Sequence, residues 1–250
     1  MSLVRDTWLV FVRQMTLVLR NPVWVIVGLM QPLYFLLLFG PLLKGLPQVG
    51  GANAYQFFVP GLIVQLAMFG TLFVGFALIA ELRGGVIERM RVTPVSRLAL
   101  LLGRSLRDIV QLLFQSVMLV LLALPFGLTV HVADLLLALA LVALIALLLS
   151  AVSYALALKL RSEDALAPLL NAVSMPVLLL SGILLPMSIG PGWLRTIAKW
   201  NPFSWAVDAT RALFAGDPGN DNVWKALIIL TVLAALSATW AARSFARSVR

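Results

Sequence analysis

The chain contains no cysteine and a single histidine, His131, among its 250 residues. Without cysteine there is no disulfide, no thiolate metal site and no cysteine nucleophile, and one histidine excludes a metal site built from several histidines. Charged residues are also scarce, at 12% against about 25% in soluble domains. Hydrophobic residues make up 62%, and the mean hydropathy is +1.02. The composition therefore excludes a soluble globular domain and a disordered chain.

Several catalytic motifs are missing as well. No glycine is followed by lysine, so the phosphate-binding loop G-x-x-x-x-G-K-[ST] is absent and this chain cannot bind ATP by that route. The nucleophile motif G-x-S-x-G and the zinc motif H-E-x-x-H do not occur either. We therefore predict no catalytic residue, no cofactor and no metal site in this chain, and we interpret His131 as a surface residue.

Long apolar runs dominate what is there. A bilayer core about 30 Å thick requires about 20 apolar residues in a helix. Six runs meet this requirement, at about 23–43, 57–80, 108–128, 135–158, 165–185 and 224–242. They predict an all-α integral membrane protein with six transmembrane helices in a single transmembrane domain, 1–250, because the strands of a barrel would alternate instead. The long segment before the first run argues against a cleaved signal peptide.

Basic residues indicate how these helices are oriented. The chain has 19 lysines and arginines against 10 acidic residues, a net charge of +9. Fourteen of the basic residues fall in 1–22, 81–108, 159–164 and 243–250, which share one side of a six-span bundle. Because basic loops stay in the cytoplasm, we predict that both termini are cytoplasmic. Topology then explains the charge, and we expect no nucleic-acid partner.

Two segments on the predicted cytoplasmic side have helical patterns of their own. Residues 1–22 carry apolar side chains at helical spacing beside a basic stripe, which predicts an amphipathic interfacial helix. A simple anchor and a mechanical role are both open for it. After the second run, Gly84-Gly85 allows a sharp turn, and 86–92 is predicted to be a short helix that ends at Thr93-Pro94. A short helix across the end of a bundle is a docking surface, although its arginines also serve as topology signals.

The segment 193–214, before the last run, contains two apolar stretches that are each too short to cross a bilayer. Asn201-Pro202 separates them. We predict that they dip into the outer leaflet and return as re-entrant helices, with Trp200 in an aromatic belt. Asp208 and Arg211 are three positions apart and are expected to pair on the second helix.

Polar residues inside the predicted spans are uncharged, and Glu81, Asp108 and Asp134 are placed at span ends. An ion-gradient-driven secondary transporter usually carries intramembrane charges, so the sequence disfavours this alternative without excluding it. A membrane scaffold that transports nothing is also open. Most of the uncharged polar residues are expected to bond between helices. As candidates for a substrate path we name Gln31, Tyr34, Gln65 and Asn171.

This pattern resembles the ABC-2 type permease family, and within it the permeases of the daunorubicin-resistance type. The resemblance rests on the basic amphipathic start, the six runs, the Glu-Arg-x-Arg-x-Thr-Pro stretch of 88–94, and Asn201-Pro202 followed by Arg211. It covers nearly the whole chain, and the stretch 88–94 is its most specific part.

The resemblance implies a permease subunit of an ATP-driven exporter in a bacterial or archaeal inner membrane. The substrate would be hydrophobic or amphipathic, such as a drug or a lipid-like molecule, and would leave the cytoplasm or the inner leaflet; a lipid-linked glycan is the alternative. Two copies of a separate ABC ATP-binding subunit would bind ATP and Mg. A second permease copy would complete a homodimer surrounded by membrane lipid.

The resemblance also assigns roles to segments. It implies that 1–22 is an interfacial connector, that 84–94 is the coupling helix, and that 193–214 forms the outer re-entrant helices. Contacts with the ATP-binding subunit are expected from Gly84, Gly85, Glu88, Arg89, Arg91, Thr93, Pro94 and Arg97.

Overall fold

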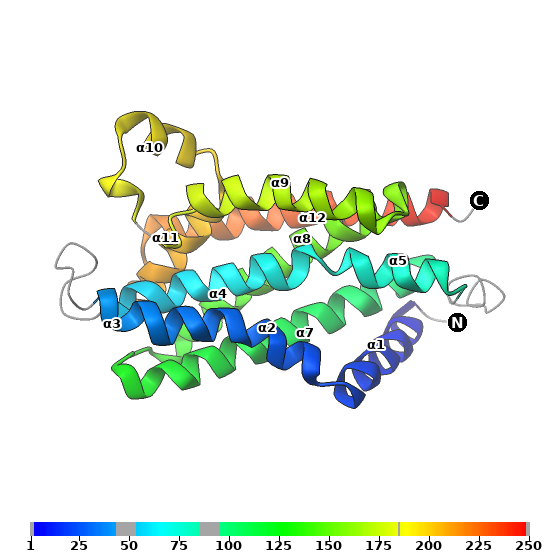
Figure 1. Ribbon diagram of the computed structural model, residues 1–250, viewed down its shortest axis with the longest axis horizontal. Coiled ribbons are helices and arrows are strands. Elements are labelled where there is room, and N and C mark those ends of the chain that lie inside the picture. Colours follow the sequence, from blue (N-terminus) through cyan, green and yellow to red (C-terminus); the bar gives the residue numbers. More distant parts are fainter. Residues whose placement is uncertain (1–2, 44–53, 86–95, 185, 249–250) are drawn as a thin grey trace.

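The described part of this protein consists mainly of long helices. The computed structural model describes residues 3–43, 54–85, 96–184 and 186–248, and every regular element in these ranges is helical. Figure 1 shows the long helices running side by side along the long axis, with both chain ends at one end of the bundle. We call this the termini end, and we call the opposite end, which carries α3, α10 and α11, the α11 end.

The elements follow one another without strands in the described ranges. In chain order they are α1 (Leu3–Arg20), α2 (Val23–Tyr34), η1 (Phe35–Phe39), α3 (Gly40–Leu43), α4 (Ala54–Leu72), α5 (Gly75–Arg83), α7 (Arg97–Ala123), η2 (Leu124–Phe126), α8 (Val132–Leu160), α9 (Glu163–Leu180), η3 (Met187–Ile189), α10 (Gly192–Ala198), α11 (Pro202–Phe214) and α12 (Asp221–Ser248). Six stretches are long and apolar enough to cross a membrane. The predicted all-α fold with six such helices is therefore confirmed.

The boundaries follow local sequence signals. Ser96 caps α7, because its hydroxyl accepts a hydrogen bond from the backbone amide of Ala99 at 3.1 Å. Asn201 caps α11 by accepting from the amide of Phe203 at 3.0 Å, and Pro202 occupies the first helical position, where no amide is needed.

Two spans differ from simple straight helices. The first continues from α2 through a π-helical turn, η1, into α3. The second breaks between α4 and α5, at Phe73 and Val74, which the apolar run did not predict. At the break the amide of Gly75 donates to the hydroxyl of Ser153 at 2.9 Å, and a Cβ on Gly75 would lie 2.7 Å from the Ser153 carbonyl oxygen. The glycine thus lets α5 approach α8 closely.

Helix α8 lies at the centre of the bundle. It packs against α12, α4 and α7, and its buried face consists largely of alanine and leucine, which lets neighbouring backbones come close. The spans of α2 and α9 are the least covered, with 17% and 22% of their residues buried. Their exposed apolar faces are those that lipid or another protein must cover.

Candidate functional site

The segment predicted to dock an ATP-binding subunit starts at the termini end (Figure 1). α5 ends at Arg83, and Gly84 and Gly85 form a turn, with Gly85 in the left-handed region at φ +65°. Glycine adopts this conformation without steric cost. The residues expected to follow in the contact, Glu88, Arg89, Arg91, Thr93 and Pro94, lie outside the described residues. The described chain resumes at Ser96, and Arg97 is the first residue of α7.

Helix α1 is docked on the bundle. It packs along α7, and Gly103 is a point of close approach: a Cβ added there would lie 2.7 Å from the Cβ of Val10 and 2.9 Å from the carbonyl oxygen of Thr7. α1 nevertheless exposes large apolar side chains such as Trp8 and Leu19. Such exposure is typical of a helix at a membrane interface, so one helix combines an exposed apolar surface with a tight contact to the start of α7.

A buried ion pair joins α5 to α7 beside the docking segment. Glu81 of α5 pairs with Arg104 of α7, and the two side chains are only 22% and 4% exposed. Gln14 of α1 donates from Nε2 to Oε1 of Glu81 at 3.4 Å. We call these three residues the Glu81 cluster. The cluster links the N-terminal helix to the helices on both sides of 86–95, so a displacement of that segment would reach all three helices together.

A second polar group lies further along α7. Arg107 Nη1 lies 3.0 Å from Asp108 Oδ1, and the hydroxyl of Tyr154 on α8 donates to Asp108 Oδ2. The side chains of Asp108 and Tyr154 are buried. Helix α7 begins at Arg97 and continues past Asp108, and the placement of Asp108 at the end of a membrane span stays a prediction. Pairing with Arg107 and Tyr154 offsets the cost of burying this carboxylate.

Arg211 bonds to three backbone carbonyls at the α11 end. Its guanidinium lies 3.7 Å from the centroid of the Phe57 ring. Nε donates to the Phe57 carbonyl at 3.2 Å, and Nη2 donates to the carbonyls of Gly182 and Ile183 at 2.8 and 3.3 Å. The expected partner Asp208 is 3.9 Å away on an exposed side chain, so the carbonyls hold Arg211 more than the ion pair does. Burial lowers the pKa of Arg211 to about 10, partly offset by Asp208, and the group stays charged at neutral pH.

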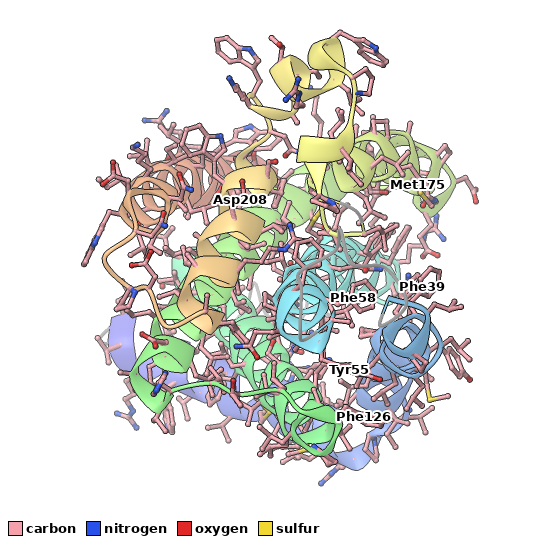
Figure 2. The ribbon with its side chains drawn as sticks, turned by 90° about the vertical axis from the view of Figure 1, so that its left-hand side faces the viewer. Phe39, Tyr55, Phe58, Phe126, Met175 and Asp208 are labelled. Carbon is pink, nitrogen blue, oxygen red and sulfur yellow. The ribbon has the colours of Figure 1, made fainter. Side chains whose placement is uncertain are left out.

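Aromatic rings from η1, α4 and η2 pack together at the same end. Tyr55 stacks on Phe126 at 5.3 Å and Phe39 on Phe58 at 6.3 Å between ring centroids. Figure 2 looks onto this end and shows the four rings lying between neighbouring helices. Gln56 donates to the backbone carbonyl of the last residue of α11. These contacts fix α4 relative to its neighbours.

The segment predicted to be re-entrant consists of two helices with different surroundings. α10 stands away from the bundle in Figure 1, whereas α11 packs against α12, α4 and α8. Asn201 ties the junction to α9 by donating to the Val177 carbonyl at 2.8 Å. Trp200, directly before it, is 87% exposed. The helices are where the sequence indicated, and their insertion into a leaflet stays a prediction.

The residues named for a substrate path do not form one cluster. Gln31 and Tyr34 lie on the exposed face of α2, and Asn171 lies on an exposed face of α9. Gln65 is buried in α4, and its Oε1 has no hydrogen-bond partner among the described residues. The roles of these four residues stay predictions.

Residues 5–215 match the family described as ABC-2 type transporter. The chain belongs to this family. It is 30% identical over 222 residues to the daunorubicin resistance ABC transporter permease protein DrrB1 of Streptomyces coeruleorubidus. These residues cover 88% of this chain and 77% of DrrB1. It is 29% identical over 204 residues to the putative transport permease ycf38 of Cyanophora paradoxa, covering 78% and 69%.

A more distant relative is the probable multidrug ABC transporter permease YbhR of Escherichia coli (strain K12), 25% identical over 201 residues, which cover 77% of this chain and 53% of that one. No solved structure matches the chain. The resemblance to ABC-2 permeases is thus confirmed. As a member of this family the chain is the membrane subunit of a transporter rather than an enzyme, and membership implies an ABC ATP-binding partner and a lipid environment.

Sequence reasoning missed the polar contacts between helices of this ABC-2 permease. Glu81 was placed at the end of a span, and Arg104 and Arg107 were counted among the basic residues of 81–108 that set the topology. Their spacing carries a signal all the same: Arg104, Arg107 and Asp108 lie three and four positions apart, so they share one face of a helix. The partners on α1, α5 and α8 could not be read from the sequence.

Proposed function

We propose that this chain is the permease of an ATP-driven exporter that moves a hydrophobic or amphipathic substrate out of the cytoplasm or inner leaflet. Two copies of a separate ATP-binding subunit would hold ATP and Mg, and a second permease copy would complete a homodimer. The termini end would face the cytoplasm in an inner membrane. The names of the relatives, a daunorubicin resistance permease and a probable multidrug permease, support a drug-like substrate.

The Glu81 cluster is the observation on which the proposed mechanism rests. The segment 84–94, the proposed coupling helix, connects α5 to α7. The ion pair between Glu81 and Arg104 joins the same two helices. Gln14 adds α1 to the link. A push on the coupling helix would therefore move α1, α5 and α7 as one body. Rigid-body motion of packed helices is an established form of conformational switching.

The least covered spans support the proposed homodimer. The α2 face that carries Tyr34 and the α9 face that carries Asn171 are exposed and largely apolar. A second copy seated against α2 and α9 would cover them and bring these polar residues to the dimer axis. The buried α11, with Arg211 on backbone carbonyls, supports a re-entrant position for this segment, because its polar groups are satisfied inside the protein.

Charge reversal in the coupling helix tests the proposal. With the ATP-binding subunit co-expressed and the complex placed in proteoliposomes, Arg89→Glu with Arg91→Glu should abolish ATP-driven dye export and lower substrate-stimulated ATP hydrolysis by at least about tenfold, since like charges across an interface cost several kcal/mol. The matched control reverses two exposed cations at the other end, Arg195→Glu with Lys199→Glu, and should export normally.

Export at the wild-type rate by the Arg89→Glu, Arg91→Glu complex would refute docking through this segment. Export driven by an ion gradient in the absence of the ATP-binding subunit would refute the ABC mechanism and restore the secondary transporter. If lipid-linked glycans stimulate hydrolysis where neutral and cationic dyes do not, the drug-like substrate is wrong and the glycan alternative is right.

A further inference from the structure

A groove of about 730 Å³ opens between α1, α2, the α4–α5 break and α7. Its size falls within the range of sites for small organic ligands, about 300–1,000 Å³. The groove is narrowed on one side where Gln115 of α7 meets α2: its Nε2 donates to the Val25 carbonyl at 2.8 Å, and a Cβ on Gly28 would lie 2.8 Å from the same nitrogen. None of the four residues that the sequence assigned to a substrate path lines it.

One wall of the groove carries aromatic side chains. Phe73, in the break between α4 and α5, and Phe76, in α5, both line it. Their rings are nearly parallel, 7° apart with centroids at 5.9 Å, and Phe69 continues the stack at 6.3 Å and 13°. The three rings thus follow the chain from α4 through the break into α5. A planar apolar molecule can lie against such a wall with the offset stacking that aromatic rings prefer.

The rest of the lining is rich in uncharged polar side chains. Its side-chain amides come from α1, from the residue after α1 and from α7, and they are Gln14, Asn21, Gln111 and Gln115. On α7, Oε1 of Gln111 accepts from Arg107 at 3.4 Å, which leaves its NH2 group as a donor, whereas Gln115 uses its NH2 on α2 and keeps its oxygen as an acceptor. A donor and an acceptor thus lie one helical turn apart, a spacing that suits hydroxyl and carbonyl groups.

Both charged residues of the lining are already paired. Arg107 lies 3.0 Å from Asp108, and Glu163 lies 3.4 Å from Arg83. Arg107 cannot neutralise a ligand without leaving the buried Asp108 unpaired. Glu163 is well exposed, so it lies at the solvent edge of the lining rather than in its apolar part. A charge brought into the apolar part without a partner is costly. We propose that the groove binds an uncharged amphipathic molecule with a flat aromatic body and hydroxyl or carbonyl groups, as an entry site for substrate; its role in entry rests on the proposed export function.

Because the chain has no cysteine, a single introduced thiol can report on the groove. Ala77→Cys places it on the exposed part of α5 that lines the groove, and Ala235→Cys places it on the exposed surface of α12, outside the groove. The permease alone, in lipid nanodiscs, is treated with a small maleimide in the presence of Nile red, which is neutral and flat, of cationic rhodamine 6G, or of anionic anilinonaphthalene sulfonate.

Nile red should slow modification of Ala77→Cys by about tenfold and leave Ala235→Cys unchanged, while the two charged dyes have little effect. In the Ala77→Cys background, Gln111→Leu should raise the Nile red concentration for half protection about fivefold, as expected for the loss of one hydrogen bond. Asn222→Leu, a polar residue outside the groove, is the matched substitution and should leave this concentration unchanged.

Three results would each overturn the assignment. Nile red could protect both thiols equally, or a charged dye could protect the Ala77→Cys thiol more strongly than Nile red does. The Ala77→Cys thiol could also fail to react at all, which would mean that lipid or a second copy fills the groove. The result is separable from the proposed function. Protection in the permease alone with no dye-stimulated hydrolysis in the full complex would count against export of such molecules only. Stimulated hydrolysis without protection would count against the groove only.

Discussion

The two ends of the bundle are held together by different kinds of bond. At the termini end, side chains bond side chains: Glu81 pairs with Arg104, and Gln14 adds a third helix. At the α11 end, long side chains bond backbone carbonyls: Arg211 donates to three of them and Gln56 donates to two more. The bonds of the Glu81 cluster join α1, α5 and α7 to one another, so these three helices can move together as one body. Arg211 instead ties α11 to α4 and to the residues that follow α9. We therefore expect the helices to move at the termini end and to stay rigid at the α11 end.

The largest effect is expected from breaking the ion pair at the termini end. Glu81→Ala leaves Arg104 buried without a partner, and we expect the free energy of unfolding to fall by about 3 kcal/mol. Titration with SDS in mixed micelles measures this. The double variant Glu81→Met with Arg104→Met removes both charges and should regain most of the loss. If the single variant is as stable as the wild type, the pair does not hold α5 to α7.

At the α11 end, Arg211→Met removes the donor to the carbonyls of Phe57, Gly182 and Ile183 and should cost about 2 kcal/mol by the same titration. Arg211→Lys keeps the charge but loses the planar fork, and should fall between Met and wild type. An effect of Arg211→Met larger than that of Glu81→Ala would reverse the ranking of the two ends.

A smaller effect is expected where α1 meets α7. Gly103→Ala places a methyl group 2.7 Å from Val10, so α1 must move away, at a cost of about 1–2 kcal/mol. Gly192→Ala is the matched change in open space, with no atom within 4 Å, and should stay within about 0.5 kcal/mol of the wild type. Equal stability of both variants would mean that α1 is not clamped at Gly103.

The smallest effect concerns the exposed neighbour of the Glu81 cluster. Arg83 lies 3.4 Å from Glu163, and both side chains are well exposed, so solvent screens the pair. Arg83→Ala should change the free energy of unfolding by less than about 0.5 kcal/mol. A cost near that of Glu81→Ala would show that burial does not separate these two ion pairs.

Helix positions were largely predictable from the sequence, because apolar runs of membrane length leave no other regular structure. The start of α11 was signalled by Asn201-Pro202, where Asn201 forms a local hydrogen bond. Ser96, which caps α7, was not recognised as a helix start from the sequence. The break at Phe73 and Val74 was not predictable, because it comes from the contact of Gly75 with Ser153, far away in the chain.

The candidate site was predictable in part for the same reason. The motif Glu-Arg-x-Arg-x-Thr-Pro identified the family, which the match over 5–215 confirmed. The charges behind it were read as topology signals, because sequence spacing places Arg104 and Asp108 on one helix but does not tell which helices they face. Partners such as Glu81 and Tyr154 depend on the packing of α5 and α8. The groove escaped prediction because residues of α1, α2, α4, α5, α7 and α9 together form it.

Cross-linking can show whether the ATP-binding subunit docks on 84–94, since the chain has no cysteine of its own. Glu88→Cys places one thiol in the proposed coupling helix, and Asp217→Cys replaces an exposed acidic residue at the α11 end. Each variant is purified with the ATP-binding subunit and treated with a short thiol-to-amine cross-linker. We expect a covalent permease–ATPase product from Glu88→Cys alone. A product from Asp217→Cys alone, or equal products from both variants, would show that the ATP-binding subunit does not dock on 84–94.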